Sequence, residues 1–202
     1  MLSARPSLVL ASASETRARV LRGAAVPFTL DPAHVDEAAV KQRCRDRGDT
    51  AEEASMRLAE CKALAVAPRH PDAFVLGADQ LLVCGSRWLD KPETPDHARA
   101  TLEVLRGRRH RLISGMAVIR GDVVVWRHVE VAELAMRAYS DAFIDWYLRE
   151  AGCDALNIVG ACRLEGAGAQ AFAAIEGDYF TILGLPLLPL LDFLRREAML
   201  VD

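Results

Sequence analysis

The chain has 202 residues, of which 51% are hydrophobic and 26% are charged, and its formal net charge is −3. This length and composition suit a single water-soluble domain, here residues 1–202, that can bury a substantial core. The small negative charge argues against a general attraction to nucleic acid or to an anionic membrane, and we expect neither as a partner.

The five cysteines are scattered and include no C-x-x-C pair: Cys44, Cys61, Cys84, Cys153 and Cys162. This pattern predicts reduced thiols rather than a disulfide framework or a zinc site. Residues 1–6 show no signal-peptide pattern, and no apolar run is long enough to span a bilayer. We therefore expect a cytoplasmic protein.

Strands and helices alternate in the first part of the chain. Residues 7–11 predict a short apolar strand. Ser12 and Glu15 have the spacing of a capping box, which predicts a helix from there to about Arg22. Residues 26–30 predict a second short strand.

The next segment, residues 32–49, is polar and irregular, and we assign it no element. Thr50 and Glu53 form a second capping-box pattern, so we expect a helix that runs to about Val66.

An aspartate interrupts the most apolar stretch of the chain, residues 73–83. Such a run predicts a strand buried on both faces. Asp79 therefore needs a cation, a metal or a hydrogen-bond donor, because burying an unpaired carboxylate is costly. Gly77, on the same face, predicts room beside the acid. The alternative is an acid that emerges at the strand end and caps a turn.

The second half of the chain adds an antiparallel pair to this alternation. Thr94 and Pro95 predict the start of a helix that ends near Leu105. The remaining predicted elements are paired strands over 111–120 and 122–136, a helix over 140–150, a loop-rich segment over 152–168, a strand over 169–175 and a helix over 185–200. This order predicts an α/β fold with a mixed sheet flanked by helices.

Three clusters of polar residues follow predicted strands or lie near them. The first, residues 12–17, combines serines, free backbone N–H groups and Arg17 at a helix N-terminus. These groups suit a phosphate, although plain N-capping is the favoured explanation of this cluster taken alone. The second joins the acids of Val35-Asp36-Glu37 with Lys62, and the third is Lys91-Pro92. Isolated charges of this kind are commonly solvated.

Together the clusters offer acids for a divalent cation and bases for a polyphosphate, which is the usual arrangement for phosphoanhydride chemistry. The chain contains no P-loop, no G-x-S-x-G elbow and no H-E-x-x-H pair. The five histidines are scattered, and we assign none of them as a metal ligand.

In this order the clusters resemble the Maf family of nucleotide pyrophosphatases over nearly the whole chain. The matching segments are Leu10-Ala11-Ser12-Ala13-Ser14-x-x-Arg17, Val35-Asp36-Glu37, Leu58-Ala59-Glu60-x-Lys62-Ala63, Gly77-Ala78-Asp79, Lys91-Pro92, Gly107-Arg108-x-His110-x-x-x-Ser114-Gly115, and Ile175-Glu176-Gly177-Asp178-Tyr179 followed by Gly184-Leu185-Pro186.

The resemblance implies an α/β fold with a deep nucleotide-binding cleft, often in a homodimer. It also implies hydrolysis of nucleoside triphosphates to the monophosphate and pyrophosphate with a divalent metal, Mg²⁺ or Mn²⁺. By position, Asp79 would be the general base or metal-organising acid, and Glu37 a second acid of the metal site. The same comparison implies that phosphates and developing charge are met by Ser14, Arg17, Lys62 and Lys91.

The chain departs from the commonest family pattern at the first turn. Glu15 and Thr16 replace a proline and an arginine, so one cation is lost and an acid is gained. Gln80 and Glu165 stand where members resembling thymidine and uridine triphosphate hydrolases have threonine and glutamine. These two residues instead match the branch that looks like 7-methyl-GTP hydrolases.

The exchange at Glu165 has a physical meaning, because a carboxylate only accepts hydrogen bonds and suits the N–H edge of guanine. We therefore expect a modified purine such as 7-methyl-GTP as substrate, with Thr16, Gln80 and Glu165 among the substrate-binding residues. Thr16 lacks the aromatic ring that would stack on a methylated base. The alternative substrates are dTTP and UTP.

Two other functions are compatible with the sequence. The altered first turn is compatible with a non-catalytic nucleotide-binding regulator of septum formation. The cationic stretch over residues 106–111 is compatible with a nucleic-acid patch. No aromatic residue interleaves with that stretch, which favours a solvated turn.

Overall fold

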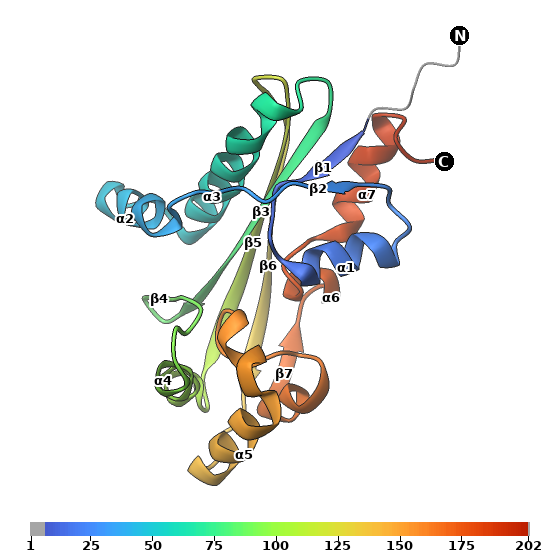
Figure 1. Ribbon diagram of the computed structural model, residues 1–202. Coiled ribbons are helices and arrows are strands. Elements are labelled where there is room, and N and C mark those ends of the chain that lie inside the picture. Colours follow the sequence, from blue (N-terminus) through green and yellow to red (C-terminus); the bar gives the residue numbers. More distant parts are fainter. Residues whose placement is uncertain (1–6, 202) are drawn as a thin grey trace. The chain divides into compact units, whose positions relative to one another are not determined.

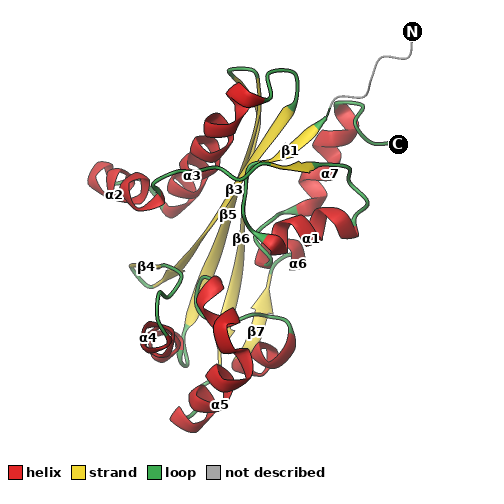
Figure 2. Cartoon of the chain, in the orientation of Figure 1, coloured by secondary structure: helices red, strands yellow, loops and turns green. Residues whose placement is uncertain are grey.

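The computed structural model describes residues 7–201. Residues 1–6, where the sequence shows no signal-peptide pattern, lie outside this range. Seven strands form one mixed sheet in the order β2-β1-β3-β5-β6-β7, and β4 pairs with β3 (Figures 1 and 2). The predicted fold class, an α/β fold with a mixed sheet flanked by helices, is confirmed.

The chain divides into two compact units, which are described separately. The first comprises residues 1–79, 114–130 and 178–202, and the second comprises residues 80–113 and 131–177. The division cuts three long strands: β3 (Phe74–Cys84), β5 (Arg109–Arg120) and β6 (Val123–Met136).

The first unit is built around two parallel pairings. Strand β1 (Leu8–Leu10) pairs with β2 (Thr29–Leu30) on one side and with β3 on the other. The helices of this unit are α1 (Glu15–Gly23), α2 (Glu37–Arg47), α3 (Ala51–Val66), α6 (Tyr179–Ile182) and α7 (Leu187–Arg196), with the short 3₁₀ helix η1 (Ala67–Arg69) after α3.

The side chains of successive residues in β1 and β3 point to opposite faces of the sheet, so the core of this unit is divided between the two faces. Leu8 and Leu10 of β1 join Phe74 and Leu76 of β3 in a cluster with residues of α1 and α7. Val9 joins a second cluster with residues of α3. Because successive strand residues point to opposite faces, each face is covered by its own helices. Figure 1 shows α3 on one side of the strands and α1 and α7 on the other.

The second unit carries β4 (Arg87–Leu89), β7 (Phe172–Glu176), α4 (Pro95–Leu105) and α5 (Asp141–Ala151), with 3₁₀ helices η2 (Gly152–Asn157) and η3 (Gly166–Ala171). Strand β4 turns back antiparallel on β3, and β7 pairs antiparallel with β6. The Tyr139 hydroxyl donates to the carbonyl of Leu102 at 2.7 Å, which ties the segment before α5 to α4.

Several helix starts follow the sequence closely. Thr50 and Glu53 form the predicted capping box of α3, Thr94 caps α4, and Ser140 caps α5. Each cap side chain accepts a hydrogen bond from a backbone N–H of the first turn, which would otherwise lack an intrahelical partner.

The first helix begins differently from the prediction. Ser14, rather than Ser12, is the N-cap of α1 and accepts from the N–H of Arg17 at 3.4 Å. Glu15 lies in the first turn and pairs with Arg22 at 2.5 Å. The capping box assigned to Ser12 and Glu15 was therefore wrong, because the chain continues past Ser12 before the helix starts.

Other boundaries differ as well. The strand predicted over residues 26–30 is only Thr29–Leu30, and the unassigned segment over 32–49 contains α2. Asp36 caps α2 by accepting from the N–H of Ala39 at 2.9 Å. The signal was present, because an aspartate precedes a run of helix-forming residues. Most of α2 is exposed, so it lacks a clear apolar period that would reveal it.

Candidate active site

A lysine between two carboxylates is the centre of the candidate site in the first unit. Lys62 Nζ lies 2.6 Å from Asp79 Oδ1 and 2.7 Å from Glu37 Oε1. The side chains of Lys62 and Asp79 are 10% and 6% exposed, whereas that of Glu37 is 44% exposed. The cluster thus reaches from the sheet to the surface, and Asp79 has the cationic partner that its burial requires.

Three elements place these charges together. Asp79 belongs to β3, Lys62 lies on the buried side of α3, and Glu37 is the first residue of α2. The prediction that Asp79 lies in a strand buried on both faces is confirmed by β3. Val35-Asp36-Glu37 is the start of a helix rather than an irregular loop, so the position of Glu37 is fixed by the cap at Asp36.

Close packing of α3 on the sheet brings Lys62 to Asp79. A Cβ added to Gly77 would lie 2.0 Å from the carbonyl oxygen of Ala59 and 2.8 Å from the nitrogen of Ala63. A Cβ on Gly115 of β5 would lie 2.6 Å from the carbonyl carbon of Ser55. Gly77 therefore leaves room on its face of the strand, as the sequence predicts, and the backbone of α3 fills that room.

One oxygen of Asp79 is buried without a partner. Asp79 Oδ2 has no hydrogen-bond partner among the described residues, although Oδ1 accepts from Lys62. An orphaned buried carboxylate oxygen is uncommon and calls for an unseen ligand or a catalytic role. In residues 7–201 no group of three or more His, Cys, Asp or Glu side chains is arranged to hold a metal ion. Two carboxylates with one orphaned oxygen nevertheless fit a hard cation that also binds phosphate oxygens and water.

The first turn of α1 lies in the same unit. Arg17 is 8% exposed, and its guanidinium donates to the carbonyl oxygen of Ala78, directly before Asp79. Burial lowers the pKa of Arg17, while the negative charges of Asp79 and Glu37 act to raise it. Arg17 is therefore a second buried cation close to both acids. Ser14 and Thr16 of this turn are half-buried.

Glu15 does not add its charge to this cluster. Its carboxylate pairs with Arg22, farther along α1, and both side chains are largely exposed. The acid gained at the first turn is thus compensated on the outer surface of the helix.

The other predicted site residues lie in the second unit. Gln80 follows Asp79 in β3 and is half-buried, and Lys91 is an exposed residue two positions after β4. Glu165 is half-buried and is the N-cap residue of η3. The structure therefore brings Arg17, Glu37, Lys62 and Asp79 together in one unit, and it places Gln80, Lys91 and Glu165 in the other.

The cationic stretch over residues 106–111 is largely compensated within the second unit. Arg106 pairs with Asp141 at 2.5 Å, Arg109 pairs with Glu176 at 3.0 Å, and His110 is buried. The stretch is therefore not a run of exposed, unopposed cations.

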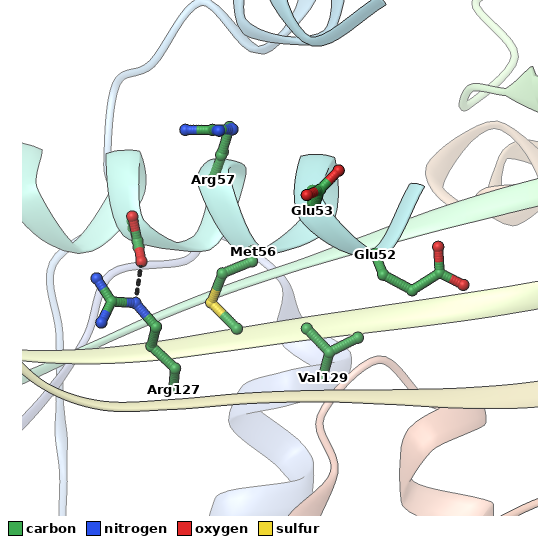
Figure 3. Close-up of a pocket in the computed structure, with 7 residues that line it drawn as sticks. Glu52, Glu53, Met56, Arg57, Arg127 and Val129 are labelled. Atoms are coloured by element: carbon green, nitrogen blue, oxygen red, sulfur yellow. Dashed lines mark hydrogen bonds and ion pairs between the residues drawn. The ribbon is translucent and has the colours of Figure 1, made fainter. Parts of the chain in front are cut away.

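A pocket of about 420 Å³ lies between α3 and β6, away from these charges. Met56 and Val129 face each other across it (Figure 3). Its two arginines are each paired with a carboxylate: Arg127 with Glu60, and Arg57 with Asp49. The pocket contains no residue of the Lys62 cluster, and its charged lining consists of three glutamates and these two arginines.

These features define an α/β protein with buried cations and carboxylates beside a helix-covered strand, suited to an anionic substrate. The chain belongs to the Maf-like protein family, which residues 7–197 match. No helix among the described residues has the length and apolar character needed to cross a membrane.

Relatives with high identity match the chain over almost its full length. A protein of Paramagnetospirillum magneticum named nucleoside triphosphate pyrophosphatase is 49% identical, with 96% of this chain and all of that protein covered. One with the same name from Rhodospirillum rubrum is 45% identical, with 98% of each chain covered. A protein of Rhizobium meliloti named 7-methyl-GTP pyrophosphatase is 46% identical, with 95% of this chain and 96% of that one covered.

Proposed function

We propose that this protein hydrolyses nucleoside triphosphates to the nucleoside monophosphate and pyrophosphate. The observation that carries the proposal is Lys62 held between Asp79 and Glu37, beside the buried Oδ2 of Asp79, which has no partner among residues 7–201. The matching relatives cover nearly the whole chain, and their names support the same reaction.

In the proposed reaction Asp79 acts as the general base. It accepts a proton from a water molecule as the water oxygen forms a bond to the α-phosphorus. The bond between the α-phosphorus and the bridging oxygen to the β-phosphate breaks, and pyrophosphate leaves with the electron pair. The hydrogen-bonding capacity of Oδ2 gives the carboxylate a free acceptor for that water.

Negative charge that develops on the phosphates is offset by lysines. Two of the three N–H donors of the Lys62 ammonium go to Asp79 and Glu37, and a phosphate oxygen would take the third. Lys91 is proposed as a further cation for the phosphates. Ser14 caps α1, and the N–H groups of this helix start suit a phosphate oxygen.

Asp79 and Glu37 would hold a divalent cation, Mg²⁺ or Mn²⁺. Such a cation, when bound, supplies charge neutralisation at the phosphate oxygens and lowers the pKa of bound water. The donor set suits a hard ion that keeps several water or phosphate ligands.

For the base, we propose a modified purine such as 7-methyl-GTP, with dTTP and UTP as the alternative substrates. Gln80 and Glu165 support the purine, because the Glu165 carboxylate would accept from the N–H edge of guanine. The name of the Rhizobium meliloti relative points the same way. Thr16 would line the site without stacking on the base.

The test is a substrate panel of 7-methyl-GTP, GTP, dTTP and UTP with purified protein, read by pyrophosphate release with Mg²⁺, with Mn²⁺ and with a chelator. We expect metal-dependent release that is fastest with 7-methyl-GTP. Asp79→Asn should abolish it. Asp72→Asn, an exposed aspartate just before the same strand, is the matched control. Release that survives in Asp79→Asn would contradict the mechanism, and a preference for dTTP or UTP would contradict the purine assignment.

A further inference from the structure

Arg17 directs its side chain into the protein. Nη1 donates to the carbonyl oxygen of Ala78 at 2.8 Å and to Ser12 Oγ at 3.0 Å, and Nε donates to the carbonyl oxygen of Gly184 at 2.8 Å. A guanidinium has five N–H donors in a rigid planar fork. Three of these five are committed to protein oxygens from three separate segments, so the orientation of the group is fixed.

The hydrogen bond to Ala78 takes the place of a backbone hydrogen bond that β1 does not make to β3. Strands β1 and β3 are parallel, with Leu10 opposite Leu76, and the N–H of Ala11 donates to the carbonyl of Leu76 at 2.8 Å. A continued β1 would offer its next donor, two residues on, to the carbonyl of Ala78. The chain instead leaves the sheet after Leu10, and the guanidinium of Arg17 supplies the donor.

This bond controls the peptide that precedes Asp79. The carbonyl of Ala78 and the nitrogen of Asp79 belong to one planar peptide unit, so holding the oxygen also fixes the plane from which the Asp79 side chain departs. Arg17 also binds Ser12 Oγ, which accepts from the N–H of Ser14 at 3.3 Å. One side chain thus orders both the middle of the buried strand and the turn that starts α1.

We propose that Arg17 is a positioning residue that acts on Asp79 through the carbonyl of Ala78, and that it does not bind phosphate directly. The inference rests on the proposed function, because the reaction gives the orientation of Asp79 its importance. It assigns Arg17 a different role from the phosphate contact that the family resemblance predicts.

The first test is Arg17→Lys, which keeps the charge but loses the planar fork, compared with Arg19→Lys. Arg19 is an exposed arginine on the same helix. Because a small misplacement of a catalytic group costs about a hundredfold in rate, we expect kcat of Arg17→Lys to fall by that order. KM and the inhibition constant for pyrophosphate should stay at the wild-type values, and Arg19→Lys should match wild type.

Two results would overturn the inference. One is an unchanged kcat in Arg17→Lys. The other is a rise of KM together with weaker inhibition by pyrophosphate, which would mark a direct phosphate ligand. Should Arg17→Lys not fold, Ser12→Ala carries the test, because it removes one of the three acceptors and leaves Ala78 and Gly184. Ser12→Ala should lower kcat less than Arg17→Lys is expected to, again with KM unchanged.

A readout that needs no turnover separates this inference from the proposed function. The carboxyl ¹³C resonance of Asp79 should move in Arg17→Lys and stay in place in Arg19→Lys. A protein that releases pyrophosphate from none of the nucleotides would contradict the proposed function alone. An Asp79 resonance that is the same in wild type and in Arg17→Lys would contradict the positioning role, whatever the activity.

Discussion

Lys62 Nζ and Asp79 Oδ1 lie 2.6 Å apart in the interior of the first unit, joining α3 to β3 across 17 residues of sequence. Glu37 adds a second carboxylate to the same ammonium at 2.7 Å. Removing the lysine would leave a buried aspartate facing another acid, whereas removing the aspartate would leave the lysine with one partner. The two substitutions are therefore unequal.

We predict that Lys62→Met lowers the free energy of unfolding by about 3–5 kcal/mol, because it leaves the buried Asp79 carboxylate without its cation. The double variant Lys62→Met with Asp79→Asn should recover part of this loss, since it removes both charges. Urea unfolding of the wild type and both variants measures the effect. A double variant that is less stable than Lys62→Met would contradict this account of the pair.

Gly77→Ala tests the close approach of α3 to the sheet. Its Cβ would lie 2.0 Å from a backbone oxygen, so the helix must move. We expect a loss of about 1–3 kcal/mol in the free energy of unfolding, together with lower activity as Lys62 shifts. Gly23→Ala is the control, because its Cβ would meet no atom within 4 Å. Equal stability of the two variants in thermal melting would show that Gly77 is not needed for this packing.

His110 predicts a pH dependence of stability. It is 5% exposed, its Nδ1 has no partner among the described residues, and burial lowers its pKa from 6.5 to about 4. The folded state therefore favours the neutral ring, and this contribution is fully present above pH 6.5 and is lost as the pH falls towards 4.

At 1.36 kcal/mol per pKa unit, the contribution of His110 is about 3 kcal/mol at most. His110→Gln has no ring to titrate, so its free energy of unfolding should fall less than that of the wild type between pH 6.5 and pH 4. Chemical unfolding at several pH values gives both curves. Parallel curves would mean that His110 is protonated equally readily in the folded and unfolded states.

Glu165→Gln tests the assignment of the base. An amide both donates and accepts, so the variant should lose its preference for the N–H edge of a guanine and gain relative activity on dTTP and UTP. Because mismatched buried polar groups are costly, we expect the ratio of kcat/KM values to shift by at least about tenfold. The measurement is the ratio of kcat/KM for 7-methyl-GTP to kcat/KM for dTTP, in the wild type and in Glu165→Gln. An unchanged ratio would show that Glu165 takes no part in base recognition.

Local patterns in the sequence determined much of the framework. The apolar run around Asp79 and the capping residues Thr50, Thr94 and Ser140 lie where they were predicted, and the alternation of strands and helices predicted the fold class. These signals depend on residues a few positions apart. They predict the same helix starts and strands in most folds, because they act through local backbone hydrogen bonds and side-chain periodicity.

The tertiary structure decided what those residues contact. Arg17 reaches Ala78 and Gly184, which are 61 and 167 residues away, and the backbone of α3 fills the space beside Gly77. Glu37 takes its position from a mostly exposed helix whose pattern did not reveal it. The sequence alone identified an acid that needs a partner. Which cation reaches it depends on how closely two distant segments pack, and no local pattern encodes that distance.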